Sequence, residues 1–366
     1  MSNAYKKKIL LNFNPDLSFN PKGRHVRDGL SATLRTGNNL WIACDERSTI
    51  ERLTLNEDGA FGHHVSYNLN EYLTLPANAD CEIDIEGFAS DGKYLWLVGS
   101  HSLMRKKPKK DESPEKQIKR LAKVKEDPNR YLLARIPLSL NESSGDYELC
   151  KICPDKLDYS ETASAAQLAG DGVRNQLMEA LENDVHFKHF LKIPGKDNGF
   201  DIEGIAVRKD KVFLGIRGPV LRGWAVILEL RVEELTDNYF RLKPDKKHRL
   251  YKKHFLHLEG MGIRDLQVLN DDLLVLAGPS MDLDGTIAVY RWKNGLKQED
   301  ESITHRKELD RLFDIPHGHG ETSGKDKAEG ITLFDPRHLL VVFDSPTSER
   351  KNGDAGVEAD LYEIPF

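Results

Sequence analysis

Glutamate stands in front of a glycine and an apolar stretch at three places in the chain. The stretch DIEG begins at Asp201, EIDIEG contains Asp84 and Glu86, and KDKAEG ends in Glu329 and Gly330. Carboxylates that converge on one point must bind a cation or pair with basic side chains, because they cannot all stay ionised alone. Oxygen-only ligands favour Ca²⁺ or Mg²⁺ over zinc. These acids are therefore the first candidates for a functional site.

The acidic motifs belong to a repeat. In four copies an apolar pair follows ten residues after the first apolar residue of the motif, as Leu95 follows Ile85 and Val212 follows Ile202. A fifth copy at 328–346 fits with one inserted residue. Each copy is a short apolar stretch, a polar turn such as SDGK or RKDK, and a second stretch rich in Val, Leu and aromatic residues. This pattern is typical of a β-hairpin.

Further strand-like stretches follow the hairpins and predict four antiparallel strands per copy. We therefore expect an all-β fold, a closed β-propeller of five blades, with a sixth, degenerate blade as the alternative. The last copy offers only one further strand, and the stretch KKILLNF at 7–13 is expected to complete that blade and close the ring. On this interpretation residues 5–366 form a single propeller domain.

The repeat also predicts where the acids lie. Adjacent strands of a meander run in opposite directions, so the start of the first strand and the end of the second lie on one face. The first strand is innermost and lines the mouth of the central channel. We expect Glu86, Glu203 and Glu329 to hold a metal there, with Asp84 and Asp201 beside them for ligand binding.

Basic residues at the same level leave two interpretations open. Arg264 replaces the glutamate in the fourth copy, as Ser31 does in the first, and Arg217 ends the second strand of the third copy. On one interpretation both arginines orient a phosphate or carboxylate of a ligand, and His101 is the candidate proton carrier. The alternative is that Arg264 and the glutamates form a structural salt cluster that plugs the channel.

Two insertions interrupt the repeat. The charged insertion, at 105–128, has ten basic residues against three acids between Arg105 and Lys125. It is either a patch for phosphate or another acidic partner, or a solvated surface segment, which we favour. The second, at 160–192, has a helical composition with apolar spacing at Leu177, Leu181 and Val185. We expect a helical insertion that lies over the ring as a lid or packs on its rim.

Two weaker motifs contain cysteine and histidine. Cys150 and Cys153 form a CxxC that lacks partners for a structural zinc site, so we expect incidental cysteines rather than a metal or redox pair. His317 and His319 lie in a glycine-rich loop that leads to Glu329, and a surface loop is the favoured interpretation over ligand contact.

Composition narrows the classes of partner. The chain of 366 residues has a formal net charge of −6 and no apolar run as long as a membrane span. Four cysteines in this length do not form a disulfide framework, and no secretion signal is evident, although a removed signal would leave no trace. We expect a cytoplasmic monomer with a small anionic ligand and no nucleic-acid or membrane partner.

The DIEG and AEGIT hairpins resemble an uncharacterised bacterial family of predicted β-propellers, a domain of unknown function, over most of the chain. Their strand starts are similar to those of esterase-like phytase propellers and, more distantly, gluconolactonase-type propellers. The resemblance implies that Glu86, Glu203 and Glu329 bind calcium or another divalent ion that holds a phosphate ester or activates water on a lactone. Arg264 departs from that pattern and favours an anionic ligand.

The sequence thus leads to two hypotheses of function. The first is binding, and in an enzyme metal-assisted hydrolysis, of a small anionic or ester ligand at the Glu-lined mouth. The alternative is a non-enzymatic scaffold for protein interaction whose channel is plugged by the Glu/Arg cluster.

Overall fold

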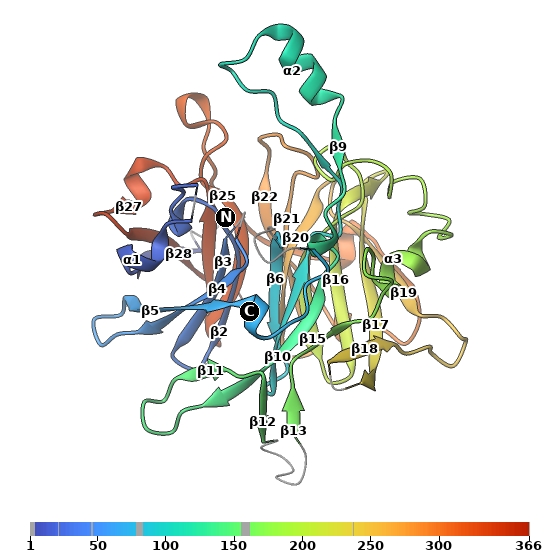
Figure 1. Cartoon of the computed structure of the whole chain (residues 1–366), viewed down its shortest axis with the longest axis horizontal. Helices are drawn as coiled ribbons and strands as arrows, with labels where there is room; N and C mark the ends of the chain where they lie inside the picture. Colours follow the sequence, from blue (N-terminus) through green and yellow to red (C-terminus); the bar gives the residue numbers. More distant parts are fainter. Residues whose placement is uncertain are drawn as a thin grey trace.

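The computed structural model describes residues 4–20, 22–44, 47–77, 83–154, 162–236 and 238–365, and within them the chain is mostly β-structure (Figure 1). As the ten-residue spacing predicts, a hairpin is formed in each copy of the repeat. The first and second strands of the hairpins are β2 (Leu30–Thr36) and β3 (Asn39–Cys44), β6 (Ile85–Ser90) and β7 (Tyr94–Gly99), β15 (Asp201–Arg208) and β16 (Lys211–Leu221), β20 (Gly262–Leu269) and β21 (Asp272–Gly278), and β25 (Lys327–Asp335) and β26 (His338–Asp344).

A third and a fourth strand extend each hairpin into an antiparallel meander. The third strands are β4 (Thr49–Leu55), β10 (Leu133–Leu140), β17 (Trp224–Thr236), β22 (Ile287–Trp292) and β28 (Gly356–Glu363). The fourth strands are β5 (Phe61–Asn68), β11 (Tyr147–Leu149), β19 (Tyr251–His257), β24 (Asp310–Ile315) and β1 (Tyr5–Asn12). The fourth strand of the last meander thus comes from the N-terminal segment, as predicted, with Ile9 opposite Ala359.

The first strands of the meanders contact one another in turn. β2 contacts β6 and β25, β15 contacts β6 and β20, and β20 contacts β25. Each first strand therefore has two such neighbours, and the arrangement is propeller-like.

The hydrophobic core lies between neighbouring meanders. Five apolar clusters of described residues fill these spaces; one contains Trp41 of β3 and Phe88 of β6, and another contains Tyr290 of β22 and Phe213 of β16. Strands that are covered on both faces need near-continuous runs of Val, Ile, Leu and aromatic residues, which the repeat supplies. Full burial of one such side chain contributes about 1.5–3 kcal/mol, so these clusters hold the meanders against one another.

Shorter elements connect or flank the meanders. Additional strands are β12 (Ile152–Pro154) with β13 (Thr162–Ser164), β14 (Ala166–Leu168), β18 (Tyr239–Leu242), β23 (Ser302–Thr304) and β27 (Lys351–Asn352). The 3-10 turns are η1 (Val26–Asp28), η2 (Leu69–Glu71), η3 (Pro128–Arg130), η4 (Gly295–Lys297), η5 (Arg306–Glu308), η6 (Gly320–Thr322) and η7 (Ser348–Arg350). The helices, of which α1 (Pro15–Ser18) is the first, are short. Within the described residues, no helix is long and apolar enough to cross a membrane.

The charged insertion forms a projecting arm. Its two sides pair as β8 (Met104–Arg105) and β9 (Val124–Lys125), and α2 (Pro114–Leu121) lies between them. Figure 1 shows α2 at the top of the molecule, away from the meanders. We refer to residues 105–125 as the basic arm.

The prediction of a helical insertion over 160–192 is wrong for most of its length. Only α3 (Gln176–Leu181) is helical in the described part of this segment, which begins at 162. The helix ends early because the Asp184 carboxylate accepts hydrogen bonds from the backbone N–H groups of His186 and Phe187, which favours a turn.

The contacts of α3 favour the rim over a lid. Leu177 and Leu181 are fully buried, in a cluster with Trp96 of β7 and Leu214 of β16. Val185, the third residue of the predicted apolar spacing, is 74% exposed. The α3 segment therefore fills the space between the second and third meanders.

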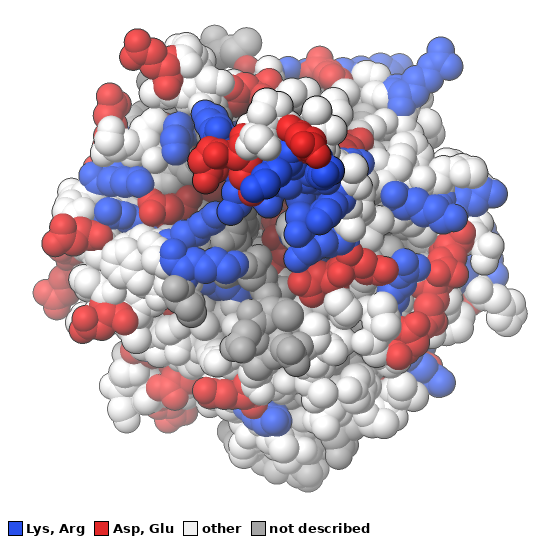
Figure 2. Space-filling view, turned by 45° about the horizontal axis from the view of Figure 1, so that its top comes forward, with Lys and Arg blue, Asp and Glu red and all other residues white. Residues whose placement is uncertain are grey.

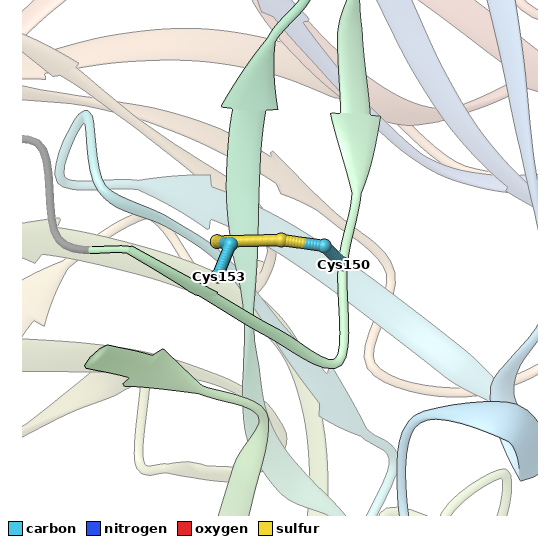
Figure 3. Close-up of a disulfide and its surroundings, with 2 residues drawn as sticks. All are labelled: Cys150 and Cys153. Carbon is cyan, nitrogen blue, oxygen red and sulfur yellow. A yellow bond between two sulfur atoms is a disulfide. The ribbon is translucent and has the colours of Figure 1, made fainter.

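A disulfide corrects the interpretation of the CxxC motif. Cys150, directly after β11, and Cys153, in β12, are joined through their Sγ atoms with their Cα atoms 6.2 Å apart (Figure 3). The expectation of incidental cysteines, which rested on the lack of partners for a structural zinc site, is therefore wrong. The CxxC spacing alone fits a zinc site, a redox pair or incidental cysteines, and nothing in it singles out a bridge that closes a short turn.

Candidate functional site

One residue in the first strand of every hairpin forms a β-bulge. The pairing of β6 with β7 passes from Ile85 opposite Gly99 directly to Gly87 opposite Val98, so Glu86 is the extra residue. The equivalent residues of the other copies are also skipped, namely Ser31, Glu203, Arg264 and Glu329. Because a bulge bends its strand and re-aims the extra side chain, the repeat presents one polar side chain per copy at the same point of the ladder.

The glycine after each glutamate permits a close approach of neighbouring first strands. A Cβ atom at Gly204 would lie 3.0 Å from Cα of Asp265, and one at Gly87 would lie 3.1 Å from the backbone N of Ile205. At Gly330 the corresponding distance to the backbone N of Thr33 is 3.1 Å. Such approaches to backbone are tighter than most Cβ contacts allow, which agrees with the expectation that first strands crowd here.

Arg217 joins two of the predicted acids. Its Nη1 lies 2.5 Å from Oε1 of Glu203, and its Nη2 donates to Oδ2 of Asp201. All three side chains are buried, with residue exposures of 5%, 3% and 2% for Arg217, Glu203 and Asp201. A guanidinium that bridges two carboxylates in this way satisfies charges that could not be buried alone.

Arg264 joins the third and fifth copies of the repeat. Its Nε donates to Oε2 of Glu329 at 2.8 Å and lies 3.7 Å from Oε2 of Glu203. Arg264 is 6% exposed. We refer to Asp201, Glu203, Arg217, Arg264 and Glu329 as the inner ion cluster; its members come from β15, β16, β20 and β25.

The other two predicted acids lie beside this cluster. Asp84 pairs with Nη2 of Arg130 at 2.9 Å, and Arg130 also donates to Oγ of Ser102 at 3.0 Å. Glu86 is half-buried. Against the effect of burial, the charges of Asp84, Asp201 and Glu86 raise the pKa of Arg130. The acids that the sequence singled out therefore gather in one region.

The sequence reasoning missed two residues of this region. Arg130 follows the charged insertion and has no equivalent in the repeat, so the repeat spacing gave no signal for it. Asp265 follows Arg264 where three other copies have glycine, and it is 2% exposed. Its carboxylate accepts from the backbone N–H groups of Leu266 at 2.7 Å and Ile331 at 2.8 Å, and so ties β20 to β25.

Carboxyl groups outnumber guanidinium groups among the described residues of this region. The arginines are Arg130, Arg217 and Arg264, and the acids are Asp84, Glu86, Asp201, Glu203, Asp265, Glu329 and Asp344. Burial raises the pKa of Glu203 to about 7, against the opposing charges of Arg217 and Arg264. Burial also raises the pKa of Asp201 and of Asp344. Burial thus disfavours the charged form of these three acids.

His101 is held by two hydrogen bonds. Its Nδ1 lies 2.8 Å from the carbonyl oxygen of Gly99, and its Nε2 accepts from Nδ2 of Asn175 at 2.7 Å. The residue is 1% exposed, and burial lowers the pKa of the imidazole to about 4. Both ring nitrogens are therefore engaged, and the ring joins the end of β7 to the cap of α3; a role as proton carrier stays a prediction.

The glycine-rich loop carries His319 on the surface. His319 is exposed and precedes η6, while His317 is half-buried. The loop contacts Asp284, whose carboxylate accepts from the backbone N–H of Gly324 at 3.0 Å. This agrees with the surface-loop interpretation.

The described members of the predicted ligand set are not arranged as a cation site. Among the described residues, no three His, Cys, Asp or Glu side chains lie together as a set of metal ligands. Two of the predicted ligands, Glu203 and Glu329, are instead paired with arginine. A divalent ion would have to displace a guanidinium from a buried carboxylate, so the donor set fits Arg264 better than Ca²⁺ or Mg²⁺.

The fold and the bulged first strands define an all-β, propeller-like protein. The chain belongs to the family described as "Protein of unknown function (DUF3616)", which matches residues 29–360. This agrees with the resemblance to an uncharacterised family, while the finer similarity to phytase propellers stays a prediction. A search of curated proteins gives no match.

Solved structures with propeller-like folds cover nearly the whole chain. Glutaminyl cyclase of Myxococcus xanthus is 8% identical with a TM-score of 0.40, over 99% of this chain and 97% of that one. A glucose dehydrogenase is 12% identical with a TM-score of 0.38, over 93% and 82%. The PQQ-bound aldose sugar dehydrogenase of Streptomyces coelicolor is 9% identical with a TM-score of 0.35, over 97% and 98%. Likeness at this level says nothing about substrate or reaction.

Proposed function

We propose that the protein is a non-enzymatic interaction scaffold, a closed propeller of five blades whose channel is plugged by the inner ion cluster. The observation that carries the proposal is the position of Arg264 between Glu203 and Glu329. The contacts among the five first strands and the pairing of β1 with β28 support the blade number and the closed ring.

Electrostatics disfavour the alternative of an anionic ligand held by Arg217 and Arg264. Arg217 is already bonded to two buried carboxylates, and Arg264 is bonded to the half-buried Glu329. An incoming phosphate or carboxylate would have to break these pairs and would meet an excess of like charge. Removing one partner of a buried pair typically costs about 3–5 kcal/mol, which a small ligand would have to supply in addition to its own desolvation.

Thermal denaturation in the presence of candidate ligands tests the plug. We expect Ca²⁺, Mg²⁺ and inorganic phosphate to change the Tm of the wild-type protein no more than that of Glu203→Gln, and we expect no hydrolysis of a chromogenic phosphate ester or lactone. Any ligand that binds the native state selectively would raise its Tm. A calcium-dependent rise in Tm that is lost in both Glu203→Gln and Glu329→Gln would overturn the scaffold proposal. It would favour the hypothesis of a metal-assisted hydrolase instead.

A second candidate function is the binding of a small cationic ligand. In the described structure Oδ1 of Asp201 and Oε2 of Glu203 are buried and accept no hydrogen bond. Together with the excess of acids, these oxygens suit an ammonium or amidinium group. Titration calorimetry with spermidine distinguishes the candidates: heat of binding that Glu203→Gln abolishes would favour this function over the plug.

A further inference from the structure

The basic arm is a folded structure that stands out from the strand-start face, the face on which the first strands begin. The backbone N–H of Lys106 donates to the carbonyl of Lys123 at 3.0 Å, and Nε of Arg120 donates to the carbonyl of Lys107 at 2.6 Å. These bonds tie the two sides of the arm together. The backbone of the arm therefore has a defined course.

The base of the arm is anchored to neighbouring segments. Nε of Arg105 pairs with Asp197 at 2.6 Å, and Lys107 lies 3.6 Å from Asp282. Asp282 also pairs with Lys327 of β25 at 3.1 Å. Figure 2, in which the top of Figure 1 comes forward, shows Lys and Arg side chains gathered in the upper middle of the view. The anchors leave α2 as the part that stands farthest from the meanders (Figure 1).

The charge of the arm is not balanced by its own acids. Glu115 pairs with Lys119 at 2.7 Å and Glu112 lies 3.6 Å from Arg120. Five further lysines are exposed and have no acidic partner among the described residues: Lys109, Lys110, Lys116, Lys123 and Lys125. Crowding by Lys125, Lys123 and Arg120 lowers the pKa of Lys106. An anionic partner would relieve this repulsion.

Apolar side chains lie exposed among these lysines. Ile118 is 68% exposed, Leu121 is 45% exposed, and Val124 is 43% exposed. Ile118 and Leu121 are three residues apart on α2 and so lie on one side of the helix. No residue of α2 is buried. The arm thus combines a cationic field with a small apolar surface that the rest of the described chain leaves uncovered.

We propose that the basic arm docks the protein on an anionic lipid surface, with Ile118, Leu121 and Val124 inserted among the headgroups. Lysines around exposed aliphatic side chains are the chemistry that binds such a surface. Single-stranded nucleic acid is the poorer fit because stacking needs aromatic rings, and residues 105–125 contain none. The proposal replaces the expectation of no membrane partner, which rested on the net charge of the whole chain and on the absence of an apolar run as long as a membrane span. It goes beyond the scaffold and does not depend on the inner ion cluster.

Flotation of the full-length protein with lipid vesicles tests the docking. We expect binding to vesicles of phosphatidylcholine with about 30% phosphatidylserine, weak binding to pure phosphatidylcholine, and release by salt, since the surface field is screened. Replacing Lys109, Lys110 and Lys116 by Gln is expected to weaken binding by roughly tenfold to one hundredfold. The matched control replaces the exposed lysines Lys7, Lys243 and Lys246 by Gln and keeps the affinity.

Insertion is tested separately from charge. Ile118→Ser with Leu121→Ser is expected to weaken vesicle binding at least several-fold, because each exposed aliphatic side chain adds apolar area to the contact. The matched control is Leu235→Ser with Ile303→Ser, at positions 47% and 57% exposed outside the arm. In Ile118→Trp, brominated lipid is expected to quench the added fluorescence.

Three results would overturn the proposal. They are equal flotation with neutral and anionic vesicles, an unchanged affinity of the Ile118/Leu121 variant, and absence of quenching in Ile118→Trp. Binding of heparin or RNA that is as tight as vesicle binding, with no effect of the apolar changes, would identify a soluble polyanion as the occupant instead. None of these results bears on the plug, which is tested by Glu203→Gln.

Discussion

Arg264 donates from Nε to Oε2 of Glu329 at 2.8 Å, although it occupies the repeat position that is glutamate in three other copies. The exchange of one acid for a base turns a ring of like charges into a cluster with an internal counter-ion. Arg217 does the same for Glu203 and Asp201 from the second strand of the third copy. Arg264 could act either as a counter-ion for the acids or as a binding residue for a ligand, and its contacts favour the role of counter-ion.

Loss of Arg264 is expected to destabilise the fold. Arg264→Met leaves the buried Glu203 and the half-buried Glu329 with less counter-charge. Breaking a buried pair typically costs about 3–5 kcal/mol. The free energy of unfolding from urea titration measures the cost. The double variant Arg264→Met with Glu329→Met is expected to recover part of it, since the uncompensated carboxylate is then gone as well.

The control for Arg264 is a pair on the surface. Arg231 and Asp210 are 3.3 Å apart, with side chains 41% and 65% exposed. Such pairs are worth about 0–1 kcal/mol, so Arg231→Met is expected to change stability little. If Arg264→Met were as mild as Arg231→Met, the inner ion cluster would not be a structural plug.

Stability is expected to depend on the protonation of Glu203. Burial raises its pKa in the folded state to about 7, above the value of about 4.3 for an unperturbed glutamate. Between these two values the folded state binds more protons than the unfolded state, so this residue makes stability fall as pH rises. The slope is at most about 1.4 kcal/mol per pH unit, and below pH ~4.3 its contribution is constant.

The contribution of Glu203 to the pH dependence of stability is obtained by comparing the wild type with Glu203→Gln. Urea unfolding of the wild type and of Glu203→Gln is measured from about pH 4.5 to 7. As pH rises, the free energy of unfolding of the wild type is expected to fall relative to that of the variant. Glutamine has the shape of glutamate but does not ionise. The contributions of the other titrating groups are the same in both proteins and therefore cancel in the difference. A difference that stays constant across this range would contradict the raised pKa.

The repeat predicted much of the site because spacing is local. The hairpins, the N-terminal fourth strand and the gathering of Glu203 and Glu329 all follow from copies aligned on their second strands. The glycine of each Glu-Gly pair was also interpreted correctly, since a Cβ at Gly204 would lie only 3.0 Å from Cα of Asp265. The hairpins and the Glu-Gly pairs depend on residues within one copy or in neighbouring copies, whereas the N-terminal fourth strand follows from the one strand that the last copy lacks.

The partners of the acids could not be predicted in the same way. Glutamates at equal spacing suit a metal ion and an arginine alike, and the choice depends on side-chain geometry across different meanders. Arg130 reaches Asp84 from beyond an insertion, where no repeat position marks it. The disulfide of Cys150 with Cys153 was likewise missed because a CxxC spacing is compatible with several chemistries.

The helical insertion shows where periodicity misled the sequence reasoning. Leu177 and Leu181 are buried as predicted, but the chain turns at Asp184 and Val185 is 74% exposed. Leu181→Ala is therefore expected to cost about 2–5 kcal/mol of stability by leaving a cavity between the second and third meanders. Val185→Ala, the matched control, is expected to change stability by less than about 0.5 kcal/mol. Equal effects in urea unfolding would contradict this arrangement of α3.

His101 is expected to affect stability with the opposite pH sign to Glu203. Burial lowers its folded-state pKa to about 4, below the usual value of about 6.5. As pH falls through this window the unfolded state binds a proton that the folded state does not, so stability is lost towards acid. His101→Asn keeps a residue that tolerates the left-handed backbone at φ 54° and removes the titration.

Urea unfolding from about pH 7 to 4 is expected to show that the wild type loses more stability than His101→Asn, while the exposed His189→Gln follows the wild type. A proton carrier needs a pKa near the working pH and a nitrogen free to meet the substrate, whereas both nitrogens of His101 are bonded, to Gly99 and Asn175. If the wild type and His101→Asn instead lose stability in parallel, the imidazole takes up a proton in the folded protein, and its role as proton carrier regains support.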